Sequence, residues 1–224
     1  MWSHIEHILF PLEAFNYGAQ LVAIRGLLYR QERADEELSD RIKEADEVAR
    51  RTKGPANDHA VDAYAELAEM SCYQDAAHSM AAVGMIAPLI ESAFRAAFPS
   101  IGTGLPRRNL AKDIVKHVEE VGMKEYLPAD LEPTLAALFK YRNEMFHGGF
   151  EWSSEKLKKF ETLLGEERWP SGWFSKATSD DDPWMFYMTP AFVDHCLDVA
   201  ERVIRGIEQF GLEKNFGPLS PGCP

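Results

Sequence analysis

Three polar side chains close together in the sequence have the clearest capacity for chemistry. Arg142, Asn143 and His147 stand at the end of an apolar-periodic segment, directly before the pair Gly148 and Gly149. An arginine keeps its charge and offers a planar fork of N–H donors that suits phosphate or carboxylate. A histidine can take up and release a proton near neutral pH. Together they could bind an anion and move protons beside it.

A helix must position these residues. At 100° per residue, one row of the expected helix is mainly apolar and a second row lies beside it. The first row contains Leu131, Leu135, Leu138, Arg142 and Phe146, and the second contains Phe139, Asn143 and His147. The core-facing side therefore becomes polar in its last turn, and the glycine pair ends the helix. Arg142 must then meet a carboxylate, a partner subunit or an anionic ligand. Glu91 is a candidate carboxylate, although a surface pair between Glu91 and Arg95 is the alternative.

The pattern Arg142-Asn143-x-x-x-His147 resembles the Arg-polar-x-x-x-His motif of the HEPN superfamily. Members are small α-helical domains that occur in RNA-cleaving toxins, defence nucleases and non-catalytic nucleotide-binding or scaffold proteins. In the catalytic members, two motifs meet across a dimer interface and cleave RNA without a metal. The resemblance extends from about Asp58 to Gly165 and takes in the last helix.

By this resemblance, Arg142 would hold the scissile phosphate and His147 would move protons to or from the 2′-hydroxyl or the leaving oxygen. Asn143 would orient them. We also expect Lys140 and Tyr141 to contact the substrate and Glu91 to support Arg142 from behind. No cofactor and no metal ion are expected.

Three functions remain open from the sequence. The first is a dimeric, metal-independent ribonuclease of toxin or defence type, and the second is a non-catalytic helical interaction module. The third is a nucleotide-binding or ligand-binding regulator. Besides a second copy of the chain, an antitoxin protein is a possible partner. The module requires Arg142 to be fully paired and closed to solvent, whereas the ribonuclease requires it to face an open cleft shared with a second copy.

The composition limits the partners. The chain has 224 residues, a formal net charge of −12 and 46% hydrophobic residues. Broad adhesion to nucleic acid or to an anionic membrane depends on clustered Lys and Arg, so the acidic balance argues against both. Three widely spaced cysteines predict no disulfide framework. With neither a signal peptide nor a membrane-spanning run in view, we expect a cytoplasmic protein.

The expected fold is all-α, an up-and-down helical bundle of HEPN type. We expect residues 1–56 to form an N-terminal helical extension and residues 57–212 to form the HEPN-like domain, followed by a disordered tail at 213–224. A long helix from Asp58 to Phe98 should bend between Gly84 and Pro88, because a proline removes a helical hydrogen bond.

A Trp-rich insert at residues 169–190 interrupts the helical pattern. The segment from Trp184 to Met188 predicts a short strand within a small β-hairpin, with residues 150–152 beside it. Its aromatic side chains could stack on nucleic-acid bases, but we expect them to pin the segment to the core instead. The aspartates at 180–182 indicate a turn more than a cation site.

Overall fold

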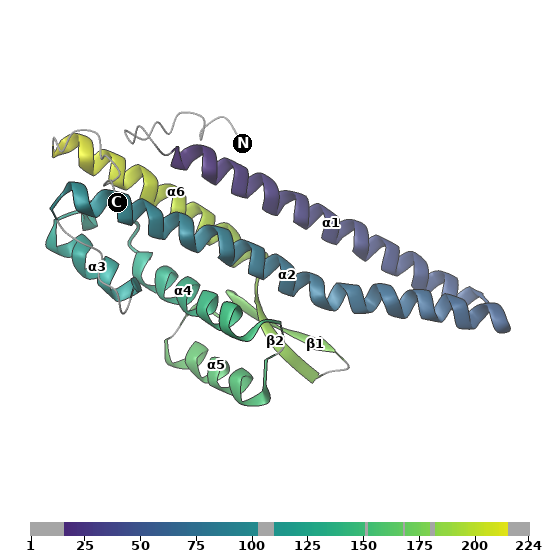
Figure 1. Cartoon of the computed structure of the whole chain (residues 1–224). Helices are drawn as coiled ribbons and strands as arrows, with labels where there is room; N and C mark the ends of the chain where they lie inside the picture. Colours follow the sequence, from purple (N-terminus) through teal and green to yellow (C-terminus); the bar gives the residue numbers. More distant parts are fainter. Residues whose placement is uncertain (1–15, 103–109, 151, 168, 180–181, 215–224) are drawn as a thin grey trace. The chain divides into compact units, whose positions relative to one another are not determined.

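The computed structural model describes residues 16–102, 110–150, 152–167, 169–179 and 182–214. These residues form mostly α-helix with one small sheet (Figure 1). The helices are α1 (Tyr17–Arg51), α2 (Pro55–Ser100), α3 (Leu110–Glu120), the short 3-10 helix η1 (Lys124–Tyr126), α4 (Leu131–Gly148), α5 (Ser154–Glu166) and α6 (Pro190–Glu213). The strands β1 (Phe174–Ser179) and β2 (Asp182–Met188) form an antiparallel hairpin. The predominantly helical class is confirmed, whereas the HEPN-type bundle stays a prediction.

The chain divides into two compact units. The first takes its residues from Met1–Arg25, Ala82–His147 and Pro190–Pro224, and the second from Gly26–Ala81 and Gly148–Thr189. Both α1 and α2 therefore contribute to each unit. The boundaries expected after residues 56 and 212 do not coincide with this division.

The core of the first unit is built by α6, α4 and the C-terminal half of α2. The helix α6 buries the apolar face that its spacing predicts, with Phe192, Cys196, Val199, Val203 and Ile207 in the interior. The contribution of α2 includes Val83, Ile86, Ile90, Phe94 and Phe98. Pro88 lies inside α2, and the helix continues through it to Ser100. The expected bend at this place stays a prediction.

By length and composition, α2 is the one helix among the described residues that could cross a membrane. Most of its apolar window is buried within the structure, as expected of a core helix, so it is weak evidence for a membrane span. In its C-terminal half, the apolar side chains from Val83 to Phe98 lie in the core of the first unit.

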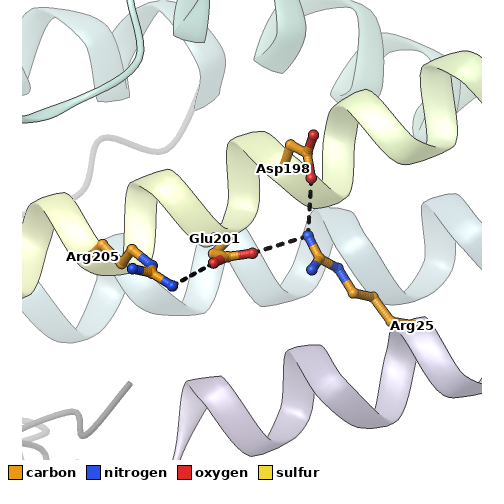
Figure 2. Close-up of polar contacts among 4 residues, drawn as sticks. All are labelled: Arg25, Asp198, Glu201 and Arg205. Carbon is orange, nitrogen blue, oxygen red and sulfur yellow. Dashed lines mark hydrogen bonds and ion pairs between the residues drawn. The ribbon is translucent and has the colours of Figure 1, made fainter. Parts of the chain in front are cut away.

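An arginine near the start of α1 joins that helix to α6. Arg25 Nη2 lies 3.0 Å from Asp198 Oδ1 and 3.1 Å from Glu201 Oε2. Arg205 Nη2 lies 2.7 Å from the other oxygen of Glu201 (Figure 2). Glu201 thus links two guanidinium groups within the first unit, and the part of α1 up to Arg25 is fixed against α6.

The Trp-rich insert forms the predicted hairpin in the second unit. Its strands pair from Phe174 with Met188 to Ser179 with Asp182, with an irregularity between Ala177 and Thr178. The backbone N–H of Trp152 donates to the carbonyl of Trp184 at 3.3 Å, so residue 152 lies beside β2 as expected.

The aromatic side chains of this insert pack against each other and against α5. Phe160 of α5 lies 5.2 Å from Trp152, 5.3 Å from Phe174 and 5.2 Å from Phe186, measured between ring centroids. Trp152, Trp169 and Trp173 are buried. The prediction that these aromatics pin the segment to a core is confirmed. Residues 180 and 181 of the aspartate triplet lie outside the described residues.

Candidate functional site

The helix α4 places the motif at its last turns. Its first part is anchored by Leu131, Leu135 and Leu138, which are buried as the sequence predicts. The helix ends at Gly148, and Gly149 has a φ of +62°, a left-handed conformation that glycine adopts without steric cost. The predicted helix end is therefore confirmed.

Arg142 is partly buried and held by a carboxylate from α2. Its Nη1 donates to Glu91 Oε2 at 2.9 Å, and its Cζ lies 5.2 Å from the centroid of the Phe139 ring. Glu91 also accepts from Arg95 one turn along α2, with Nη2 at 2.6 Å. Both pairs considered from the sequence are thus present, and Glu91 is shared between two arginines.

The carboxyl group of Glu91 has a lowered pKa. Burial by itself would raise the pKa of Glu91, but hydrogen bonds and charge attraction from Arg95 and Arg142 outweigh that effect. Glu91 therefore remains ionised at neutral pH. Two guanidinium groups and one carboxylate leave this cluster with a net positive charge in an otherwise acidic protein.

Asn143 and His147 have exposed side chains on the last two turns of α4. They are four residues apart, so they are direct neighbours on the helix surface. Lys140 is also near, and its Nζ lies 3.2 Å from Glu144 Oε1. The helix end thus offers an exposed imidazole and amide, while the side chain of Arg142 is 25% exposed.

Two expectations at this site are corrected. Tyr141 is fully buried, so its side chain cannot contact a substrate as we expected. Phe146 is 59% exposed and does not continue the apolar row into the core. The buried face of α4 is centred instead on the row that contains Thr134, Tyr141 and Met145, which leaves Arg142 at its edge.

The exposed Phe146 lies against a glycine of α2. A Cβ atom added to Gly84 would lie 3.3 Å from Phe146 Cζ. The absence of a side chain at Gly84 therefore lets this ring lie close to α2. The residues on either side of Gly84 give no local pattern that indicates this contact with α4.

The other end of α4 holds a second polar cluster. The Thr134 hydroxyl donates to the carbonyl oxygen of Asp130 at 2.8 Å, and the same Oγ1 lies 2.9 Å from His195 Nε2. The carboxylate of Asp130 lies 3.4 Å from His195 Nε2 and 3.4 Å from Arg202 Nη2. These groups satisfy one another within the first unit.

Cys196 is the one cysteine whose side chain the structure describes. It is buried, and burial raises the pKa of its thiol well above the usual range, so the reactive thiolate is disfavoured. Within the described ranges, no group of three or more His, Cys, Asp and Glu side chains could hold a metal ion. Comparisons of the chain with protein-family models, with curated proteins and with solved structures found no match.

Proposed function

We propose that this chain is a metal-independent RNA endonuclease of HEPN type that acts as a dimer. The observation that carries the proposal is the end of α4, where the side chains of Asn143 and His147 are exposed and that of Arg142 is partly exposed. A cation and a group that exchanges protons near neutral pH are what RNA cleavage without metal requires.

The reaction uses the 2′-hydroxyl of the RNA as nucleophile. A base removes its proton, the 2′-oxygen bonds to phosphorus, and the bond to the 5′-oxygen breaks. The 5′-oxygen leaves with a proton from an acid, so the products are a 2′,3′-cyclic phosphate and a 5′-hydroxyl. In this proposal His147 transfers protons and Arg142 stabilises the charge on the phosphate oxygens. Asn143 orients these two side chains.

A dimer supplies what one motif lacks. A single His147 can act as base or as acid at one moment, whereas the step needs both. A second copy related by two-fold symmetry brings an equivalent His147, so one imidazole can accept a proton while the other donates one. It also brings a second Arg142 to the phosphate, which concentrates positive charge locally in an acidic protein.

A non-catalytic interaction module is the second candidate, and the pair between Arg142 and Glu91 favours it. In this role the arginine stabilises the helix end, and the exposed part of the motif binds a protein partner such as an antitoxin, or a nucleotide ligand. The interaction module requires a fully paired Arg142 closed to solvent, and the ribonuclease requires one that faces an open cleft. Arg142 lies between these two expectations, because it is paired with Glu91 but its side chain is still 25% exposed.

We also propose the cytoplasm as the compartment. Cys196 is free and buried, and the cysteines are few and widely spaced in the sequence. These features fit a reducing environment.

The test is cleavage of a pool of structured RNAs in the presence of a metal chelator. Wild type is compared with Arg142→Ala, His147→Ala and the control His59→Ala, which changes an exposed histidine on α2 outside the motif. We expect wild type and the control to release 2′,3′-cyclic phosphate ends. Both motif variants should lose about 100-fold or more in rate while remaining folded.

The oligomeric state completes the test. Sedimentation velocity should show a dimer at the concentration used for cleavage. Absence of cleavage by a folded wild-type protein would reject the nuclease and favour the interaction module. A monomer that cleaves would instead reject the shared site.

A further inference from the structure

The two carboxylate oxygens of Glu91 are divided between two arginines. Oε1 accepts from Arg95, with Nε at 2.8 Å and Nη2 at 2.6 Å, while Oε2 accepts from Arg142 Nη1 at 2.9 Å. Arg95 and Glu91 stand on successive turns of α2, and Arg142 reaches them from α4. Each oxygen therefore has its own guanidinium partner.

This division fixes the direction of the carboxylate. A glutamate side chain with one hydrogen bond can still rotate about its terminal torsion. Two nitrogens of Arg95 on Oε1 restrict that rotation, so Oε2 stays directed at Arg142. The guanidinium of Arg142 is then held at one nitrogen by Glu91 and on one face by the Phe139 ring.

Charge gives Arg95 a second effect. A carboxylate beside a phosphate-binding arginine opposes phosphate, because it repels the anion and competes for the same N–H donors. Arg95 compensates the charge of Glu91 and occupies the oxygen that does not hold Arg142. The side chain of Arg95 is 57% exposed and that of Glu91 is 19% exposed, so this second guanidinium lies on the solvent side.

We infer that Arg95 is a positioning residue, which acts through Glu91 to hold Arg142 ready for an RNA phosphate. This inference rests on the proposed function for its catalytic consequence. The competing explanation is that Arg95 contacts RNA directly, in which case its effect does not depend on Glu91.

A double-mutant cycle separates the two explanations. Cleavage is measured for wild type, Arg95→Ala, Glu91→Gln and the double variant, with Arg51→Ala as control. Arg51 forms an equivalent pair with Glu47 four residues earlier on α1, in the second unit. We expect Arg95→Ala to lower kcat about tenfold or more, because Arg142 is misplaced, with a smaller change in KM.

In the Glu91→Gln background, the same Arg95 substitution should cause no further loss, since glutamine has one acceptor oxygen in place of two and can no longer link Arg95 to Arg142. An equal loss in both backgrounds overturns the inference and makes Arg95 a direct RNA contact. An unchanged rate in Arg95→Ala overturns it as well. The control Arg51→Ala should cleave like wild type.

A measurement without RNA keeps the inference separate from the proposed function. The guanidinium N–H signals of Arg142 are assigned in NMR spectra by comparison with Arg142→Lys. We expect these signals to shift or broaden in Arg95→Ala and to remain unchanged in Arg51→Ala.

If wild type does not cleave RNA but the Arg142 signals respond to Arg95→Ala, the positioning holds and the nuclease proposal alone fails. If the Arg142 signals are the same in Arg95→Ala and wild type, Arg95 does not position Arg142. The inference is then overturned whatever the cleavage result.

Discussion

The polar clusters at the two ends of α4 contain the same kinds of side chain but differ in what those side chains meet. At the N-terminal end, Thr134 is fully buried and its hydroxyl lies within hydrogen-bond distance of two groups, one of them His195. At the C-terminal end, Asn143 and His147 are exposed, and Arg142 retains a solvent-facing part. Each end includes an arginine, a histidine and a carboxylate.

The difference shows that residue type alone does not define a site. At the N-terminal end the polar groups pair with each other, so their hydrogen-bonding capacity stabilises the contact between α4 and α6. At the C-terminal end, the imidazole of His147 remains accessible to a ligand. Four predictions test this contrast, beginning with the largest expected effect.

Alanine substitution of the two histidines should have opposite consequences. His147→Ala should lower kcat/KM for RNA cleavage about 10²- to 10⁴-fold without changing Tm, because it removes a proton-transfer group from an exposed position. His195→Ala should lower the free energy of unfolding by about 1–3 kcal/mol, because Thr134 loses a buried partner. At temperatures below its Tm, the His195→Ala variant should still cleave RNA at the wild-type rate. If His195→Ala abolishes cleavage in a fully stable protein, the N-terminal cluster is the better site.

Two phenylalanines of α4 test the orientation of its buried face. Phe139→Ala should destabilise the fold by about 3–5 kcal/mol, because its ring is buried and lies under Arg142. Phe146→Ala should change stability by about 0.5 kcal/mol or less, since its ring is 59% exposed. Urea denaturation of dilute protein measures both effects. Equal losses would show that Phe146 is covered in solution.

Two glycines distinguish a rigid contact from an adjustable one. A Cβ added at Gly206 of α6 would lie 2.2 Å from the carbonyl oxygen of Tyr126, which is backbone and cannot move aside alone. Gly206→Ala should therefore destabilise by about 3 kcal/mol. At Gly84 the added atom meets only the far end of the exposed Phe146 ring, so Gly84→Ala should stay within about 0.5 kcal/mol. Thermal denaturation compares the two, and a larger loss for Gly84→Ala would contradict this contrast.

The charge of Glu91 should give the smallest effect, visible in acid. Because its pKa is lower in the folded state than the ordinary 4.5, Glu91 stabilises the fold above pH 4.5. That contribution is lost as the pH falls through the lower folded-state pKa. Glu91→Gln should remove this part of the acid dependence, with a difference from wild type of about 1 kcal/mol or less. If the free energies of unfolding of wild type and Glu91→Gln change in parallel from pH 6 to pH 2, Glu91 is not charged and paired in solution.

Much of the secondary structure could be predicted from the sequence, because its signals are local. The apolar spacing of α4 and the glycine pair after His147 defined that helix and its end. The spacing of α6 defined its buried face, and the apolar run from Trp184 to Met188 predicted β2. In the candidate site, Arg142, Asn143 and His147 were chosen by type and spacing alone, and their functional roles stay predictions.

Tertiary structure decided which side of α4 faces the core. Periodicity gives the angles between residues on one helix, but it does not say which of two neighbouring rows faces the core. Tyr141 and Arg142 stand in two such rows, and the packing around α4 buries the tyrosine and leaves the arginine at the edge.

Local spacing was also enough to suggest the pair of Glu91 with Arg95, since four residues separate them on one helix. The second bond of Glu91 joins residues 51 positions apart and depends on how α2 and α4 pack. The sequence by itself therefore determined the helix and the reactive groups at its end. Only the tertiary structure decided that Glu91 would divide its oxygens between two arginines, because that contact requires two distant helices to meet.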